Sequence, residues 1–260
     1  MGLLDVALVR SRVSAFPRFN RVEYSASVAS TNALAVERLY SNDSLGISFV
    51  TESQTEGRGR AGRQWVSPPQ AGVLLSTVLP TELPPAALPA VGFWTSLAVA
   101  QAVKELTGTS LGMKWPNDLL LGGVKCAGIL AEGQSRAQQS RVAVGVGVNV
   151  NRPAEVPAEI AAIAAWLSDV SGDVDRTALL LNILGCYERS YDELLNDPAA
   201  IIARWSHVAA LEGKYVAVKA LDGSILHEGI VRGIDREGSL IVETTQGRKA
   251  VRLGEIDVLS

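Results

Sequence analysis

Apolar and polar positions alternate along the first 150 residues in short runs typical of strands, and two longer runs have helical spacing. Three possible N-cap residues, Ser30 to Asn32, precede the first of these helices. A long polar loop at residues 52–65 separates the second predicted strand from the third. The pattern predicts strands at residues 21–27, 47–51, 73–79, 111–115, 124–132 and 142–150, and helices at residues 33–40 and 91–106.

The pattern changes after residue 151, where three segments have helical spacing and short apolar runs follow. We expect the helices at residues 159–170, 177–195 and 199–208, the second ending before Asp197-Pro198. Strands are predicted at residues 215–220, 226–232, 239–243 and 249–253, with turns at Asp222-Gly223 and Glu237-Gly238. The chain is therefore expected to be α+β, with a mixed β-sheet and packed helices over residues 1–212 and a small SH3-like β-barrel over residues 213–260.

Composition narrows the class of protein. Of the 260 residues 47% are hydrophobic and 20% charged, which excludes disordered and coiled-coil classes. A formal net charge of −3 gives no overall basic field that would attract nucleic acid or an anionic membrane. Two cysteines and two histidines make neither a disulfide framework nor a Cys/His zinc site.

One uncharged segment, residues 83–103, is long enough to span a bilayer. Three prolines interrupt its first half, and Thr95, Ser96 and Gln101 dilute its second half, which favours a proline-rich loop followed by a buried helix. The chain opens without a basic and apolar leader. We therefore expect a cytoplasmic protein with no membrane partner.

Three arginines lie in one Gly-rich stretch, Gly57 to Arg63. Glycine lets the backbone approach a ligand closely, and guanidinium groups bind phosphate or carboxylate in bidentate fashion. Trp65, two residues on, offers a surface for a ring. The stretch is expected to become ordered when a ligand binds. A solvated loop without a ligand and an RGG-like nucleic-acid segment are the alternative interpretations.

A second constellation runs from Lys114 through Trp115-Pro116-Asn117-Asp118 to Leu119. Gly122-Gly123 then turns the chain into the strand that carries Lys125. These residues are compatible with presenting an amide, a carboxylate and an ammonium group to a ligand, and equally with an ordinary hairpin. Cys126 lies within an apolar strand with no histidine near it in sequence, which favours a buried structural thiol.

A third motif, Gly145-x-Gly147-x-Asn149, closes an apolar strand. The dinucleotide-binding fingerprint needs a third glycine and a following helix, and neither is found here. The sequence also has no Gly-x4-Gly-Lys-Ser/Thr segment, so a bound nucleotide would be held by something other than a P-loop.

In this order, the segments resemble the biotin–protein ligase family over roughly residues 22–152. The resemblance implies a class II synthetase-like catalytic domain followed by the SH3-like barrel. It rests on matches at Ser30-Thr31-Asn32, Gln54, Gly57-Arg58-Gly59-Arg60, Gly62-Arg63, Trp65, Lys114-Trp115-Pro116-Asn117-Asp118-Leu119, Lys125, Ala127-Gly128-Ile129-Leu130 and Gly145-x-Gly147-x-Asn149.

The resemblance implies a ligase that makes biotinyl-5′-AMP from biotin and Mg²⁺-ATP and then transfers biotin to a lysine. It implies catalytic roles for Lys125, Arg58 and Asp118. Biotin-binding residues would be Ser30, Thr31, Asn32, Gln54, Arg58, Gly59, Arg60 and Lys125. ATP- and adenylate-binding residues would be Arg60, Arg63, Trp65, Lys114, Asn117 and Asn149. It assigns no metal ligands.

The implied partner is the biotin carboxyl carrier domain of an acyl-CoA or pyruvate carboxylase. About twenty residues precede the matching region, so we expect no N-terminal DNA-binding domain and no repressor role. Family members often carry a basic residue near the end of the barrel that reaches the ATP phosphates. This chain ends without one, so either Arg248 or Arg252 substitutes or the barrel mainly contacts the acceptor.

Two rival functions remain at this point. A lipoate–protein ligase uses the same adenylate chemistry, but the Gly-Arg loop and the Lys-Trp-Pro-Asn-Asp segment favour biotin. A non-enzymatic nucleic-acid-binding protein would use the Arg loop and the barrel, and the net charge of −3 argues against it.

Overall fold

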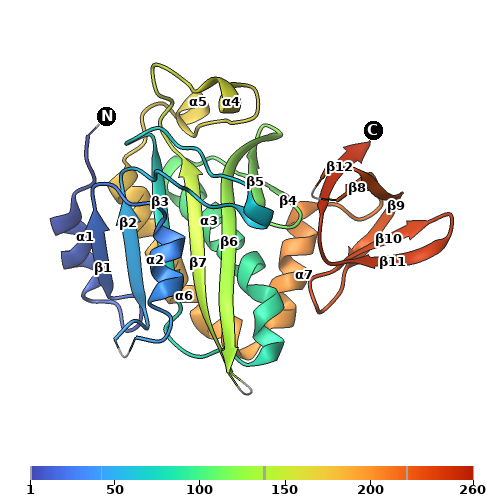
Figure 1. The fold of residues 1–260 in the computed structure, drawn as a ribbon, viewed down its shortest axis with the longest axis horizontal. Coiled ribbons are helices and arrows are strands. Elements are labelled where there is room, and N and C mark those ends of the chain that lie inside the picture. Colours follow the sequence, from blue (N-terminus) through green and yellow to red (C-terminus); the bar gives the residue numbers. More distant parts are fainter. Residues whose placement is uncertain (1, 42, 137–138, 221, 260) are drawn as a thin grey trace.

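The computed structural model describes residues 2–41, 43–136, 139–220 and 222–259. A seven-stranded mixed sheet with packed helices forms the body of the molecule, and a five-stranded antiparallel sheet follows at the C-terminal end (Figure 1). The predicted α+β class, with a mixed sheet and a small all-β unit, is confirmed. The division between residues 212 and 213 stays a prediction.

The large sheet has the order β1-β2-β3-β7-β6-β5-β4. Strands β1 and β2 are parallel, and every other neighbouring pair is antiparallel. A parallel pair needs a crossover connection, which helix α2 (Thr31–Glu37) supplies. The strands are β1 (Arg21–Ser25), β2 (Ile47–Thr51), β3 (Gly72–Val78), β4 (Gly112–Lys114), β5 (Asp118–Leu121), β6 (Val124–Arg136) and β7 (Gln139–Asn149).

Helices cover the two faces of this sheet unequally. Helix α2 lies on one face, where Ala35 and Leu39 pack in a small buried cluster with Phe49. The opposite face carries the main core, with an aromatic group in which the rings of Trp94 and Tyr187 stack 4.7 Å apart. The helices packed there are α1 (Val6–Val13), α3 (Val91–Thr107), α6 (Arg176–Asn196) and α7 (Pro198–Ala209) (Figure 1).

The segment Pro85–Thr107 is, among the described residues, the one helical stretch long and apolar enough to cross a membrane. It consists of a 3-10 turn, η2 (Pro85–Ala90), followed by α3. Helix α3 packs against α6 in the core, and most of the apolar stretch is buried inside the protein. The expected order of a proline-rich segment and then a buried helix is therefore observed.

The predicted helix at residues 159–170 is wrong. Only two short turns form there, α4 (Ala158–Ala161) and α5 (Ser168–Ser171). Between them the chain pairs with the start of β6, since the Ala165 amide donates to the Lys125 carbonyl at 2.8 Å. Trp166 and Leu167 follow this strand-like contact and are fully buried, so the apolar residues of the segment do not form one face of a helix.

Three elements form where the hydrophobic pattern predicted none. Helix α1 begins at the N-cap Asp5 and buries only Val9 and Val13, which is too few for a clear periodic signal. Strand β5 starts at Asp118, between the strands predicted at residues 111–115 and 124–132. Strand β12 (Glu255–Leu259) is stabilised by its antiparallel pairing with β8 (Tyr215–Lys219), a contact distant in sequence.

The C-terminal sheet has the order β11-β10-β9-β8-β12. Its remaining strands are β9 (Ile225–Ile234), β10 (Leu240–Thr244) and β11 (Gly247–Val251). The two predicted turns are present, and Gly223 and Gly238 adopt the positive φ that favours glycine, 85° and 77°. The Trp115 indole donates to the Gly238 carbonyl at 3.2 Å, which ties this sheet to the body of the molecule.

A buried ion pair ties the N-terminal segment to the large sheet. The Arg176 guanidinium lies 2.7 Å from the Glu52 carboxylate, and both side chains are 4% exposed. Arg176 also donates to the carbonyls of Gly72 and Gly2, and Glu52 accepts the Leu4 amide. The network fixes the end of β2, which leads directly into the polar loop at residues 52–65.

Removing Arg176 should leave the Glu52 charge buried without a partner. We expect Arg176→Ala to lower the free energy of unfolding by about 3–5 kcal/mol. The exposed pair between Arg204 and Glu193 provides the control, and Arg204→Ala should lower it by about 1 kcal/mol or less. Urea denaturation of both variants measures the difference. Equal effects of the two substitutions would contradict the prediction.

Candidate functional site

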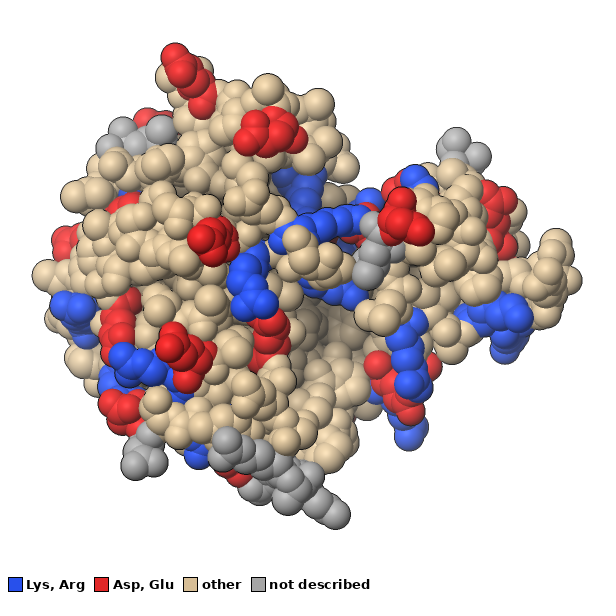
Figure 2. All heavy atoms as spheres, viewed as in Figure 1, with Lys and Arg blue, Asp and Glu red and all other residues tan. Residues whose placement is uncertain are grey.

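A cavity of about 550 Å³ opens on the sheet face next to α2. The loop at residues 57–65 covers it, and Gly254 and Glu255 of the C-terminal sheet border it. Figure 2 shows Lys and Arg side chains gathered at the hollow between the body of the molecule and this sheet, with acidic side chains beside them. The cavity is lined by all but one of the predicted site residues: Ser30, Thr31, Asn32, Gln54, Arg58, Gly59, Arg60, Arg63, Trp65, Lys114, Asn117, Asp118 and Lys125.

One end of the cavity is polar and buried. Ser30 is the N-cap of α2 and accepts the Ala33 amide. The backbone amide and the hydroxyl of Thr31 both lie within hydrogen-bond distance of the Gln54 Oε1, at 2.8 and 3.0 Å. The Thr31 hydroxyl also contacts the Ser76 hydroxyl at 2.8 Å. Because Gln54 uses its amide oxygen on Thr31, its NH₂ group remains for another partner.

Three glycines keep the sheet face open beneath the cavity. A Cβ on Gly145 would lie 2.8 Å from the Asn32 Oδ1, closer than such atoms approach. A Cβ on Gly147 would overlap the Trp65 indole, and one on Gly128 would lie 3.0 Å from the same ring. The Gly145-x-Gly147 motif therefore makes room for Asn32 and Trp65.

The basic residues at the cavity already have acidic partners. Lys125 lies 2.7 Å from Asp118, and Lys114 lies 3.4 Å from Asp257 of β12. Arg63 pairs with Glu255, also of β12. Arg58 lies 3.2 Å from Glu132 of β6. The cavity therefore balances most of its positive charge with carboxylates, two of which come from the C-terminal sheet.

Arg60 differs from the other lining bases. Its guanidinium donates to the Asn117 Oδ1 at 3.2 Å. Burial lowers the pKa of the Arg60 guanidinium from its ordinary value, while Asp118 and Glu255 act in the opposite direction. An anion beside Arg60 would therefore meet a charge that is partly shielded from water.

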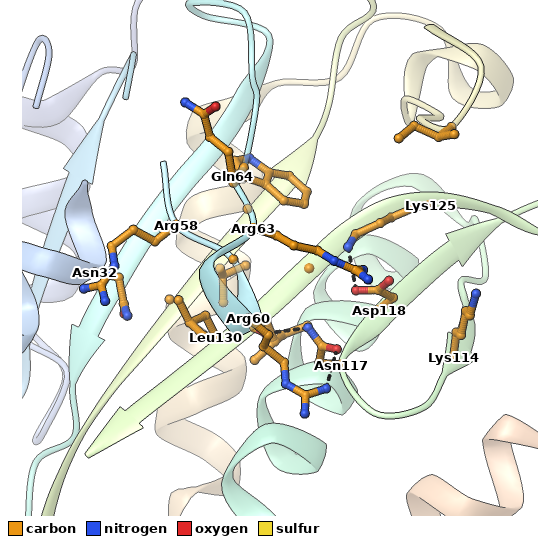
Figure 3. Close-up of a pocket in the computed structure, with 18 of the residues that line it drawn as sticks. Asn32, Arg58, Arg60, Arg63, Gln64, Lys114, Asn117, Asp118, Lys125 and Leu130 are labelled. Carbon is orange, nitrogen blue, oxygen red and sulfur yellow. Dashed lines mark hydrogen bonds and ion pairs between the residues drawn. The ribbon is translucent and has the colours of Figure 1, made fainter. Parts of the chain in front are cut away.

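The Asn117 turn is fastened to β6 from both sides. The Asn117 side-chain Nδ2 donates to the Ile129 carbonyl at 2.9 Å, and the Ile129 backbone N–H donates to the Asn117 backbone carbonyl at 3.0 Å. This arrangement fixes Asp118 beside Lys125, whose ammonium lies 5.7 Å from the centre of the Trp65 ring. Strand pairing thus brings together residues that the sequence separates (Figure 3).

Arg58 lies away from this group. Figure 3 shows it directed toward Asn32, on the side of the cavity opposite Lys125. The predicted catalytic and biotin-binding residues Arg58 and Lys125 therefore lie on different sides of the cavity in this structure, and their roles stay predictions. Arg58 belongs here to the polar end of the cavity, through its ion pair with Glu132.

Asn149 is the predicted site residue that the structure leaves out of the lining. It is 4% exposed at the end of β7, and its carbonyl accepts the Cys126 thiol at 3.5 Å. Burial raises the pKa of the Cys126 thiol to about 12, so this thiol is a structural group. The role of Asn149 in nucleotide binding stays a prediction without support from this geometry.

Several residues at the site were not predicted from the sequence. Ser76 shares one face of β3 with Leu74, but the whole strand is buried, so no alternation of polar and apolar positions marks Ser76 in the sequence. Ala162 and Ile163 also line the cavity, but the predicted helix at residues 159–170 concealed them. Glu132 and Glu255 reach the site only through tertiary pairing.

The structure separates the two candidate barrel arginines. Arg252 borders a second cavity of about 220 Å³, which shares Arg60 and Asn117 with the first, and Arg252 pairs with Glu237. Arg248 lies 4.0 Å from Glu243, within the C-terminal sheet. Of the two, Arg252 is the one that lies close to the site.

Filling the space above Gly147 should displace Trp65. We expect Gly147→Ala to lower the free energy of unfolding by about 1–3 kcal/mol through overpacking. Acrylamide quenching of fluorescence should increase, because Trp65 is partly exposed while the other tryptophans are each at most 1% exposed: Trp94, Trp115, Trp166 and Trp205.

Gly92 of α3 is the matched control, since a Cβ there meets nothing within 4 Å. Gly92→Ala should leave the quenching unchanged and should not lower the free energy of unfolding, since alanine at this open helical position stabilises by up to about 1 kcal/mol. Unaltered quenching in Gly147→Ala would contradict the prediction, because it would show that the position of the Trp65 indole does not require glycine at residue 147.

Comparison with known proteins identifies the family. The profile of the biotin/lipoate A/B protein ligase family matches residues 24–149, and that of the biotin protein ligase C-terminal domain matches residues 213–259. The bifunctional ligase/repressor BirA of Bacillus subtilis is 34% identical, over 90% of this chain and 73% of its own length. The biotin–[acetyl-CoA-carboxylase] ligase of Paracoccus denitrificans is 33% identical, over 89% of this chain and 98% of its own length.

A solved structure agrees with these sequence matches. The biotin protein ligase of Aquifex aeolicus, in complex with biotin and ATP, superposes with a TM-score of 0.74 at 26% sequence identity. The match covers 92% of this chain and 98% of that one. The sequence identity, the coverage and the shared fold agree, and the chain belongs to the biotin protein ligase family.

Proposed function

We propose that the protein activates biotin with ATP and transfers it to a lysine of a biotin carboxyl carrier domain. The observation that carries this proposal is one cavity with a buried polar end and a strongly basic region. Family membership supports the reaction class, and relatives named biotin–[acetyl-CoA-carboxylase] ligase support a carboxylase as the source of the acceptor.

The polar end supports biotin over lipoate. A ureido ring has one carbonyl acceptor and two N–H donors, and the residues at this end offer partners of both kinds. A dithiolane ring makes no such hydrogen bonds and would leave buried groups such as Thr31 and Asn32 facing an apolar surface. Leu130 and Trp65 line the cavity on the same sheet face as Gly128, Gly145 and Gly147, and these apolar groups suit a thioether ring and an aliphatic chain.

In the first step, a carboxylate oxygen of biotin attacks the α-phosphorus of ATP. The bond from that phosphorus to the bridging oxygen breaks, and pyrophosphate leaves with the electron pair. Negative charge develops on the phosphoryl oxygens, so Lys125, Arg60 and Arg63 would stabilise the transition state electrostatically. The partial burial of Arg60 strengthens this effect.

In the second step, the acceptor lysine attacks the acyl carbon of biotinyl-5′-AMP as a neutral amine. An amide bond forms, the acyl–oxygen bond to the phosphate breaks, and AMP leaves. The amine must lose a proton, and Asp118 is the pocket carboxylate suited to receive it. Lys125, 2.7 Å from Asp118, would hold that carboxylate in place at the basic region of the cavity.

The adenylate must be protected from water between the steps. The loop at residues 57–65 and the turn after α4, which contains Ala162 and Ile163, both border the cavity. Together they support a closed complex in which the mixed anhydride meets the acceptor amine instead of solvent.

Mg²⁺ belongs to the proposal as a companion of ATP. The described part of the chain contains no group of three or more His, Cys, Asp or Glu residues arranged to hold a metal ion. Mg²⁺ commonly binds through phosphate oxygens and water with few protein ligands, so it would enter with the nucleotide. We assign no step to it. We further propose that the reaction takes place in the cytoplasm.

The first test is transfer of radiolabelled biotin. With Mg²⁺ and ATP, the purified protein should label a biotin carboxyl carrier domain, and a domain whose acceptor lysine is replaced should stay unlabelled. Lipoate should neither be transferred nor promote AMP release. AMP release with lipoate, combined with no labelling by biotin, would contradict the assignment.

The second test concerns Lys125, whose ammonium lies beside Asp118 at the basic region. Lys125→Ala should reduce biotin-dependent ATP–pyrophosphate exchange by at least about a hundredfold, because a charge that stabilises the phosphoryl transfer is lost. The exposed Lys104 of α3 is the matched control, and Lys104→Ala should exchange at the wild-type rate. Wild-type exchange by Lys125→Ala would exclude the proposed role.

A further inference from the structure

Glu132 contacts two residues of the polar end, Asn32 and Arg58, although it does not itself line the cavity. It lies on β6, and its side chain is 29% exposed. One carboxylate oxygen accepts the Asn32 amide nitrogen, and the other lies 3.2 Å from the Arg58 guanidinium. Asn32 comes from the start of α2 and Arg58 from the Gly-rich loop, so a single carboxylate holds two separate segments at the polar end.

The carboxylate determines which way the Asn32 amide faces. An ionised carboxylate only accepts hydrogen bonds, so the NH₂ group of Asn32 must point toward Glu132. The Asn32 oxygen then faces Gly145. This oxygen is buried and has no hydrogen-bond partner within the part of the chain that the structure describes. Leaving such an acceptor unpaired is unfavourable, and a ligand N–H would satisfy it.

Gln54 has the opposite orientation. Thr31 occupies its amide oxygen through two contacts, so its NH₂ group remains as a donor. The polar end therefore combines an acceptor on Asn32 with donors on Gln54 and Arg58. This combination matches a ureido group, which offers two N–H donors around one carbonyl oxygen.

We propose that Glu132 is a positioning residue for biotin recognition: it fixes the hydrogen-bonding direction of Asn32 and keeps Arg58 at the ureido end. The inference rests on the proposed function. Glu132 is absent from the residues that line the cavity, so it acts through its two neighbours. Its replacement should therefore weaken recognition of biotin while leaving the ATP-binding region, around Arg60 and Lys125, intact.

The test uses Glu132→Gln in biotin-dependent ATP–pyrophosphate exchange, which needs no acceptor protein. Glutamine has the same size but presents an NH₂ group to one of the two partners, so one hydrogen bond is lost or reversed. The KM for biotin should rise about tenfold, and the KM for ATP should stay within about twofold. Glu56→Gln is the control, because Glu56 is an exposed carboxylate directly before the Gly-rich stretch Gly57 to Arg63.

A double-mutant cycle with Asn32→Ala distinguishes positioning from general damage. If Glu132 acts through Asn32, Glu132→Gln should raise the biotin KM by less than about threefold in the Asn32→Ala background. Should Glu132→Gln fail to fold, Glu132→Asp replaces it, since the shorter side chain keeps the charge but cannot reach both partners. An unchanged biotin KM, or equal rises in both KM values, would overturn the inference. Absence of exchange by the wild-type protein would instead refute the proposed function.

Discussion

The site depends on one patch of the large β-sheet where glycines leave the backbone without side chains. Strands β6 and β7 pair along their length, and the pleat would normally fill the face above them with side chains. Gly128, Gly145 and Gly147 leave that face empty, and Asn32 and Trp65 lie against the bare backbone. Without this clearance α2 and the Gly-rich loop could not approach the sheet, and the cavity between them would close.

Positive charge is concentrated at the same cavity. The chain is acidic overall, with a net charge of −3, yet five basic side chains line one cavity: Arg58, Arg60, Arg63, Lys114 and Lys125. Four of them have a carboxylate partner, and these carboxylates come from three separate strands, β5, β6 and β12. Arg60 is instead held by an amide, so it offers its charge to a ligand without first losing an ionic partner.

The sequence predicted what depends on local pattern. Strand β2 has the predicted bounds, residues 47–51, and α3 differs from its prediction by one residue, because apolar spacing and flanking breakers determine such elements. The motif residues could be predicted because their types and their order along the chain resemble those of the biotin–protein ligase family. The segment at residues 159–170 could not, since its extended form depends on pairing with Lys125.

The same limit applies to the acidic residues of the site. Glu132, Glu255 and Asp257 have no distinctive neighbours in sequence, and each is identified only by the base it meets after folding. Their partners are the residues that make the motif recognisable. Sequence analysis therefore finds the ligand-binding groups more readily than the groups that orient them, because orientation is a property of tertiary contacts.

Ion pairs at the cavity also show how the C-terminal sheet affects the binding of an anion there. Strand β12 supplies carboxylates to Arg63 and Lys114, and the Gly238 carbonyl accepts the Trp115 indole. An anion that binds these bases must exchange with β12 carboxylates, so its net gain is the difference between two sets of ionic contacts. The small sheet is thus electrostatically coupled to the nucleotide-sized cavity before any acceptor arrives. Arg252 borders the neighbouring cavity together with Arg60, and its carboxylate partner there is Glu237.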